Sequence, residues 1–362
     1  MTAGVPDIDL ARVVNLDEFE AIARRVMEPA AFDYVAGGSF DELSLAENTA
    51  AWRRFRFRPR VLVDVGTVDP STTLLGVPAA MPLAIAPMAV HGLCHPDGEL
   101  ATARAAAAAG VPFTLSTMSS RSIEEVAAAA PDGRNWFQLY TQADPGRSRD
   151  LVARAAAAGF QALVLTVDLP RLGYRDRDRR SRFDLPLLGN FPDALPTHRR
   201  DVDRLARLET VGHSLTWSDL AAIRSWSSLP LVLKGILTAE DARLAVEHGA
   251  DAIVVSNHGA RQLDRVPAGI DALEAVAAAV DGATEVWVDG GVRRGLDVAI
   301  AVALGARGVL VGRPVVWALA AGGQAGVERA LAILRDEFEI ALALLGTPTP
   351  LDLGRDHVAH AR

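Results

Sequence analysis

The sequence contains a single cysteine, Cys94, among its 362 residues. One thiol excludes an internal disulfide and a cysteine-based metal cluster, so we assign Cys94 to packing and predict no metal site. No apolar run reaches the roughly 18 residues that a membrane-spanning helix requires. The first residues also lack the basic-then-apolar order of a signal peptide. We therefore expect a cytoplasmic protein with no membrane segment.

The chain also lacks an excess of basic residues. Its 37 lysines and arginines are outnumbered by 45 aspartates and glutamates, which gives a formal net charge of -8. Binding of nucleic acid requires a surplus of positive charge on one face, so the composition argues against such a partner. Half of the residues are hydrophobic, and alanine-rich blocks that favour helices alternate with Val/Leu/Ile runs that favour buried strands. This alternation is typical of an α/β fold.

Eight apolar runs bounded by breakers predict eight β-strands. They span residues 82–89, 113–117, 135–141, 162–168, 229–236, 252–257, 285–291 and 308–314. Helical stretches lie between them, and Ser122 with Glu125 and Thr238 with Asp241 have the spacing of capping boxes. Repeated β-α units require parallel strands with right-handed crossovers. Because no G-x-G-x-x-G motif follows the first strand, as it would in an open dinucleotide-binding sheet, we predict a single closed (β/α)₈ TIM barrel.

Two stretches fall outside this repeat. Residues 1–80 hold predicted helices over 15–27 and 41–52, and we interpret them as an N-terminal helical cap on a barrel of residues 81–355. Residues 171–215 form a long connection between the fourth strand and the fourth helix, rich in arginine, aspartate and proline. A loop of this length is usually a functional lid or a disordered segment. Either interpretation predicts high mobility.

Polar residues close the predicted strands, at the end of the barrel where TIM-barrel enzymes carry their active sites. The last two strands end in VDGGVRRG and VGRP, where glycine permits close backbone approach and arginine offers a bidentate donor. We predict a phosphate site there, which would include Gly291 and Gly312; the alternative is that these glycines serve only tight turns. The polar residues are Ser116, Gln138, Tyr140, Thr166, Asp168, Lys234, Ser256, Asn257, His258, Arg261, Asp289, Arg293 and Arg313.

Three of these positions have competing interpretations. Lys234 could form a Schiff base, balance an anionic cofactor, or pair with Asp289 or Asp168. His258 and Arg261 follow the sixth strand, where the imidazole could take a proton and the guanidinium could hold a carboxylate. The alternative for His258 is a structural role, which is the more common one for a single histidine. Asp168 could orient that imidazole, as the third member of a catalytic triad does. The alternative for Asp168 is a helix cap.

Together these residues resemble the family of FMN-dependent 2-hydroxy acid oxidases and dehydrogenases, which includes glycolate oxidase, lactate oxidase and mandelate dehydrogenase. The resemblance covers nearly the whole chain, and its most specific part is SNHGARQ with DGGVRRG and GRP. Further matching motifs are FDYVAGG, AENTAAW, RFRPR, IAPMA, HPDGE, FQLY, LTVDLPRLG and LVLKGILTAEDA.

The resemblance implies a role for each matching residue. His258 would be the catalytic base, with Asp168 as its partner, and Tyr34 and Tyr140 would hydrogen-bond the substrate. Arg175 and Arg261 would clamp the substrate carboxylate, and Lys234 would lie near N1 of the flavin. The remaining FMN-binding residues would be Ala86, Met88, Ala89, Ser116, Gln138, Thr166, Ser256, Asp289, Gly291, Arg293, Gly312 and Arg313.

The implied reaction is the oxidation of an L-2-hydroxy acid to the 2-keto acid, with electrons passed to O₂ or another acceptor. It needs a base, a cationic clamp and an electron sink, and FMN supplies the sink. His258 could remove the hydroxyl proton while a hydride leaves, or remove the α-proton to give a carbanion. Both routes use the same residues. The resemblance also implies a homotetramer.

Departures from the family pattern bear on the substrate. Met118 stands where plant glycolate oxidase has tryptophan, and Tyr174 replaces an arginine before Arg175. A flexible thioether in place of an indole favours a roomier, apolar pocket. We therefore expect a medium-sized or aryl hydroxy acid such as mandelate or 4-hydroxymandelate.

Four other functions compete with this prediction. A related flavoprotein could oxidise a peptide-derived ring, as in maturation of mycofactocin. An FMN-dependent isopentenyl diphosphate isomerase would not need the combination of His258, Arg261 and Arg175. An aldolase would use Lys234 as a Schiff base. A non-catalytic flavin-binding scaffold would not need an intact base and clamp.

Overall fold

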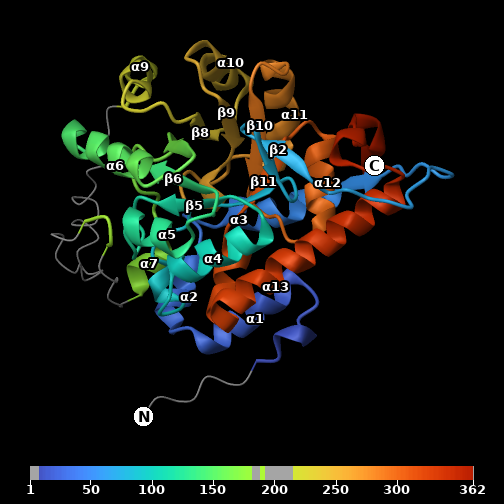
Figure 1. Ribbon diagram of the computed structural model, residues 1–362, viewed down its shortest axis with the longest axis horizontal. Helices are drawn as coiled ribbons and strands as arrows, with labels where there is room; N and C mark the ends of the chain where they lie inside the picture. The colour runs from blue at the N-terminus through green and yellow to red at the C-terminus, as the bar shows by residue number, and fades with distance from the viewer. Residues whose placement is uncertain (1–7, 182–187, 192–214, 362) are drawn as a thin grey trace.

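The computed structural model describes residues 8–181, 188–191 and 215–361, and its centre is a closed barrel of eight parallel strands (Figure 1). The strands follow chain order around the barrel, and the last pairs with the first. They are β4 (Leu83–Ile85), β5 (Phe113–Ser116), β6 (Asn135–Leu139), β7 (Ala162–Thr166), β8 (Leu231–Ile236), β9 (Ala252–Val255), β10 (Glu285–Asp289) and β11 (Gly308–Val311). Each lies within one of the eight predicted runs, so the predicted TIM barrel is confirmed.

Helices surround the barrel, and several begin and end where the sequence signals them. Ser122 and Glu125 form a capping box, and the Thr238 side chain accepts a hydrogen bond from the Asp241 amide. Gly110, the residue after α4, adopts the left-handed conformation that ends a helix. The helices of the barrel layer are α4 (Glu99–Ala109), α5 (Ile123–Ala129), α6 (Pro145–Ala157), α9 (Leu220–Arg224), α10 (Ala239–Glu247), α11 (Gly269–Val280), α12 (Gly295–Ala303) and α13 (Arg313–Leu345).

The barrel interior is a packed core. It holds Trp136 and Trp287, whose rings meet edge to face with centroids 5.3 Å apart. A second, larger apolar cluster lies between the strands and the helices. Because both faces of each strand are buried, the strands read as continuous apolar runs.

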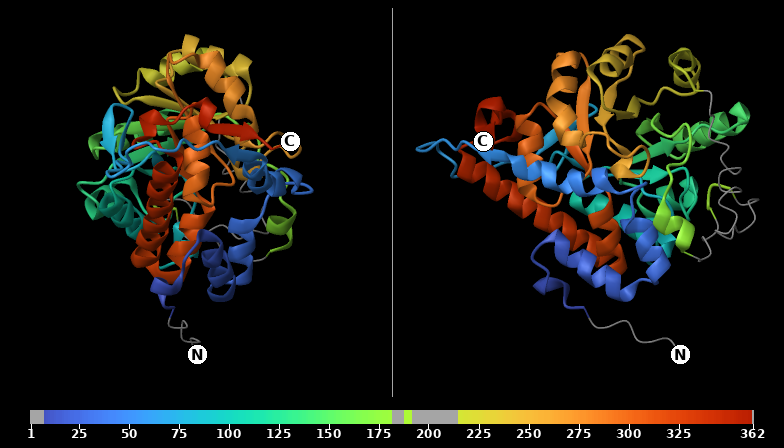
Figure 2. Two further views of the ribbon diagram at one scale, coloured as in Figure 1. Left: turned by 90° about the vertical axis from the view of Figure 1, so that its right-hand side faces the viewer. Right: turned by 180° about the vertical axis from the view of Figure 1, so that it is seen from behind.

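The N-terminal segment packs on the outside of the barrel, and α1 (Leu16–Val26) runs beside α13 (Figure 2). The prediction of a helix over 15–27 is confirmed by α1, whereas 41–52 contains α3 (Leu43–Ala50) and the start of a 3-10 helix (Ala51–Arg54). The sequence prediction missed α2 (Pro29–Ala36), which begins with proline at its first position. Short strands complete the fold: β1 (Phe55–Phe57) with β12 (Val358–His360), and β2 (Thr72–Leu74) with β3 (Val77–Ala79).

The long connection after β7 is described only in part. It contains the short helix α7 (Asp176–Arg180) and the turn at 188–191. Residues 182–187 and 192–214 of the predicted lid lie outside the described residues, so its mobility stays a prediction. Among the described residues, no helix is long and apolar enough to cross a membrane.

Candidate active site

One inward-facing side chain from nearly every strand lines the C-terminal end of the barrel. Side chains alternate along a strand, and the residues two positions earlier, such as Trp136 and Val232, belong to the barrel core. Residues at the next inward position therefore face the mouth of the barrel. They are Ala86, Ser116, Gln138, Thr166, Lys234, Ser256, Asp289 and Gly312, all of which the sequence analysis selected.

His258 lies at this mouth between a carboxylate and a phenol. Its Nδ1 atom is 2.8 Å from Oδ1 of Asp168, and its Nε2 atom is 3.2 Å from the hydroxyl of Tyr140. Because the carboxylate accepts the Nδ1 proton, Nε2 carries the lone pair that a base needs. Burial lowers the pKa of His258, although Asp168 acts in the opposite direction, so the imidazole is neutral at pH 7.

Of the two neighbours of His258, Asp168 is held as a carboxylate and Tyr140 as a neutral phenol. Burial would raise the pKa of Asp168, but His258 and Lys234 outweigh it, and the pKa is lowered. Burial and the nearby Asp168 charge raise the pKa of Tyr140, which keeps its hydroxyl as a donor. The structure thus favours the orienting interpretation of Asp168 over the helix cap.

The backbone around this pair is unusual in two places. His258 itself has a φ of 59°, a left-handed conformation that is rare for a residue with a side chain. Gly235 has a φ of 117°, and a Cβ atom there would lie 2.6 Å from Cβ of Asp168. The sequence analysis missed Gly235, although its place directly after Lys234 at a strand end was a signal.

Lys234, the only lysine in the sequence, is buried at the end of β8. Its Nζ donates to Oγ of Ser256 at 2.8 Å and lies 3.0 Å from Oδ2 of Asp289. Burial disfavours the charged amine, but Asp289 and Asp168 outweigh it and raise the pKa of Lys234. A permanently charged amine is a poor Schiff-base nucleophile, so of the three interpretations the structure favours the ion pair and charge partner.

A hydrogen-bonded row connects β5, β6 and β7. The Oε1 atom of Gln138 accepts from Ser116 Oγ at 3.1 Å, and its Nε2 donates to Thr166 Oγ1 at 3.0 Å. The amide of Met118 in turn donates to Ser116 Oγ. These contacts fix the Gln138 amide in one orientation.

Two guanidiniums share a backbone carbonyl but lack an acidic partner among the described residues. Arg261 donates to the carbonyls of Tyr34 and Gly37, both at 2.7 Å. Arg313 donates to the carbonyls of Gly37 and Gly259 at 3.0 and 2.8 Å. Burial and the neighbouring arginines lower the pKa of Arg313 to about 9. Buried cations with only neutral acceptors are poised to bind anions.

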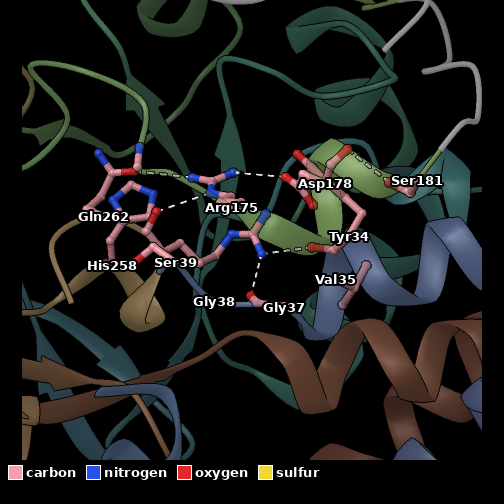
Figure 3. A network of polar contacts seen from close by, with 12 residues as sticks. Tyr34, Val35, Gly37, Gly38, Ser39, Arg175, Asp178, Ser181, His258 and Gln262 are labelled. Atoms are coloured by element: carbon pink, nitrogen blue, oxygen red, sulfur yellow. Dashed lines mark hydrogen bonds and ion pairs between the residues drawn. The ribbon is translucent and has the colours of Figure 1, made fainter. Parts of the chain in front are cut away.

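Arg175 is the third cation of this group. Its side chain is buried, its Nε donates to the carbonyl of Arg261 at 3.1 Å, and its Nη1 lies 3.7 Å from Oδ2 of Asp178. Burial and the nearby charge of Arg261 lower the pKa of Arg175 to about 10. Arg261 also lies over the ring of Tyr34, 5.0 Å from its centroid, so the three predicted substrate residues are neighbours. Figure 3 shows Arg175, Tyr34 and His258 in this arrangement.

The donors and acceptors present fit FMN. The Oδ1 atom of Asp289 is buried and has no hydrogen-bond partner within the described part of the chain, as expected of an acceptor for a ribityl hydroxyl. Arg313 offers an uncompensated charge for a phosphate, next to the N-terminus of α13. Gln138 and Thr166 offer polar atoms at the barrel mouth for the ring.

Some predicted residues have partners at the margin of the site. Arg293 lies 3.4 Å from Asp17 of α1 and over the ring of Trp317, with 5.1 Å to its centroid. Met88, Ala89 and Met118 are half-buried on the loops after β4 and β5.

Asn48 and Trp52 support the site from outside the barrel, and the sequence analysis gave neither of them an individual role. The amides of Asn48 and Asn257 donate to each other at 2.9 and 2.8 Å. Trp52 Nε1 donates to the carbonyl of Gly290 at 2.9 Å. These contacts hold the N-terminal segment against two loops of the barrel mouth, and the only signal was the motif AENTAAW.

Comparisons with known proteins find similar chains over almost the whole length. A model of FMN-dependent dehydrogenases matches residues 23–360. The chain is 49% identical over 355 residues to glycolate oxidase of Spinacia oleracea and 49% identical over 354 residues to glycolate oxidase 3 of Arabidopsis thaliana, covering 96% of each chain in both cases. A crystal structure of mandelate oxidase with (S)-4-hydroxymandelic acid superposes with a TM-score of 0.91 at 46% identity, covering 96% of this chain and 99% of that one.

Proposed function

The chain belongs to the FMN-dependent dehydrogenase family, and from that premise we propose that it oxidises an L-2-hydroxy acid to the 2-keto acid with FMN. The observation that carries the proposal is the His258–Asp168 pair beside guanidiniums of Arg175 and Arg261, which can hold a carboxylate. A base and a carboxylate clamp at one barrel mouth are what a hydroxy acid requires. Bound FMN supplies the electron acceptor that no side chain offers.

The residues divide the work according to their charge. Arg175 and Arg261 bind the substrate carboxylate and so place the α-carbon near His258. The Nε2 atom of His258 takes a proton from the substrate, either from the hydroxyl group or from the α-carbon. The Asp168 carboxylate stabilises the imidazolium that results. Tyr140 donates a hydrogen bond to the substrate oxygen, and Tyr34 bonds the carboxylate. The Met118 side chain borders the substrate.

Other residues hold the cofactor. Lys234 would place a positive charge near N1 of the ring, and Arg313 with Arg293 would bind the phosphate. Asp289 accepts from the ribityl chain. The rest of the FMN site consists of Ala86, Met88, Ala89, Ser116, Gln138, Thr166, Ser256, Gly291 and Gly312.

We propose an aryl or medium-sized substrate of the mandelate type. The exposed apolar side chains of Phe40 and Tyr174 support this choice, because their rings stack with centroids 6.0 Å apart. Phe40 follows α2, the helix that carries Tyr34, and Tyr174 directly precedes Arg175. The similarity to mandelate oxidase is further support. Glycolate would leave such an apolar surface unused.

The experiment for this proposal is a steady-state comparison of glycolate with the L- and D-isomers of lactate, mandelate and 4-hydroxymandelate, with 2-oxo-acid formation as the readout. We expect kcat/KM to be highest for an aryl L-acid. Activity with glycolate alone would contradict the aryl preference. Failure of every small acid would favour the alternative of a peptide-derived substrate.

We also propose that the protein is a homotetramer in the cytoplasm, with O₂ or another acceptor taking its electrons. The C-terminal end of α13, located in Figure 1, carries an apolar surface that supports self-association. Its side chains are more than half exposed although apolar, and they come from α13, from the 3-10 helix Pro350–Asp352 and from a loop whose Arg60 amide donates to the carbonyl of Leu345. They are Val61, Leu62, Ile340, Leu344 and Leu351.

Sedimentation velocity tests the assembly. The unchanged protein should sediment as a tetramer, and Leu62→Asp should dissociate it, because a carboxylate would be buried without a partner. A matched change at an exposed apolar residue elsewhere, Leu263→Asp, should leave it intact. A monomer before any substitution would contradict the assembly.

A further inference from the structure

The side-chain amide of Gln262 connects the two loops that carry the substrate cations. It is 7% exposed and forms four hydrogen bonds, the full number for an amide with both donors and two acceptor positions used. Its Nε2 donates to the carbonyls of Asp168 at 3.2 Å and Arg171 at 2.8 Å. Its Oε1 accepts from the Gly173 amide and from Nη2 of Arg175, both at 3.2 Å. All four partners lie on the connection after β7.

The backbone of that connection lies directly on the loop of Gln262. A Cβ atom on Gly173 would collide with the carbonyls of Arg261 and Gln262, so only glycine allows this approach. Arg175 follows two residues later and donates through Nε to the carbonyl of Arg261. The guanidinium is therefore held on two sides by residues 261–262, as Figure 3 shows for the contact with Gln262.

The chemistry of this contact matters because the acceptor is neutral. An amide oxygen orients the guanidinium without neutralising its charge, whereas a carboxylate at the same position would form a bidentate ion pair. The nearest acidic group, Asp178, is 3.7 Å from Nη1. Gln262 therefore orients Nη2 of Arg175 without adding a second negative charge to that of Asp178.

We propose that Gln262 is a positioning residue that aims Arg175 at the substrate carboxylate while adding no negative charge beside the guanidinium. This inference rests on the proposed function. On this proposal Gln262 contributes to substrate affinity without touching the substrate. It also connects the clamp with the base, because the same amide holds the backbone of Asp168.

The test measures ligand binding to the FMN-loaded protein rather than turnover. The probes are benzoylformate, which carries a carboxylate, and its neutral amide, titrated against the flavin absorbance. Gln262→Glu should weaken benzoylformate binding about tenfold or more, because the new carboxylate competes for Arg175, and should change amide binding less than twofold. Gln324→Glu is the matched control, because Gln324 Oε1 also accepts from an arginine, Arg104, at 2.7 Å outside the site.

Repeating the titration in the Arg175→Met variant distinguishes an effect on the position of Arg175 from a general disruption of the loop. In Arg175→Met, Gln262→Glu should weaken benzoylformate binding much less than it does in the unchanged protein, since only direct charge repulsion remains and the part that acts through Arg175 is gone. An equal loss for both probes, or the same loss with and without Arg175, would overturn the role of Gln262. If the unchanged protein binds benzoylformate no better than the amide, the proposed carboxylate clamp fails and the inference with it.

Discussion

Nδ1 of His258 lies 2.8 Å from Oδ1 of Asp168, although 90 positions separate the two residues in the chain. The barrel brings them together because His258 follows β9 and Asp168 follows β7, two strands away at the same end. The contact fixes the tautomer of the imidazole and leaves Nε2 as the basic atom. The proposed chemistry depends on this arrangement.

Replacement of His258 should remove turnover but not the cofactor. We expect His258→Ala to retain FMN, because the predicted phosphate and ribityl contacts are made by other residues, and to lower kcat by about 10²- to 10⁴-fold. Stopped-flow reduction and the flavin spectrum measure both effects. The exposed His360 provides the control substitution His360→Ala. Normal turnover without His258 would exclude it as the base.

Replacement of Asp168 should alter the pH profile as well as the rate. Burial already lowers the pKa of His258, and Asp168 is the main group that opposes this shift. Without the carboxylate the pKa falls further, so the acidic limb of kcat/KM in Asp168→Asn should move to lower pH. The plateau should fall by roughly 10²-fold or more, because the imidazolium loses its counter-charge. An unchanged acidic limb would show that Asp168 does not act on His258. The control is Asp176→Asn, at a half-exposed aspartate that pairs with Arg180.

Arg261→Lys should weaken substrate binding. A lysine keeps the charge but replaces a rigid fork by a single ammonium, so a carboxylate loses bidentate contact. We expect KM to rise about tenfold, with a smaller change in kcat. Arg265→Lys, four residues along on the exposed surface, is the control. Equal kinetics for the two variants would remove Arg261 from the clamp.

Lys234 should set the potential of the flavin. Its amine is ion-paired with Asp289, and that carboxylate helps to raise the pKa of Lys234, so the amine would place a positive charge beside the ring of FMN bound as proposed. Lys234→Met should lower the reduction potential, because the reduced anionic ring loses a favourable charge. A redox titration measures this. An unaltered potential would contradict the proposed place of Lys234; selective ¹⁵N-lysine labelling, which gives one signal in this chain, reports its protonation directly.

The sequence predicted the barrel well because its signals are local. Each strand is a short apolar run closed by a polar residue, and those closing residues share one end of a parallel barrel. The helix α2 escaped prediction because its eight residues carry no helical repeat longer than two turns.

The direction of each side chain and the register of the barrel strands could not be predicted from local sequence signals. Sequence left Lys234 with two acidic candidates, and only the packing of the strands selects Asp289. Arg261 points to carbonyls of Tyr34 and Gly37, more than 200 residues earlier in the chain, which no motif indicates. The close approach of Gly235 to Asp168 likewise depends on the bulge between β8 and β9.

The central claim is that an L-2-hydroxy acid reduces FMN bound in this barrel. The most direct measurement is an anaerobic titration of the purified, FMN-loaded protein with L- and D-mandelate while the flavin absorbance is recorded, followed by admission of air. We predict that the L-acid bleaches the flavin band and the D-acid does not, and the rate of recovery in air then shows how well O₂ serves as acceptor. A flavin that no 2-hydroxy acid bleaches would contradict the account.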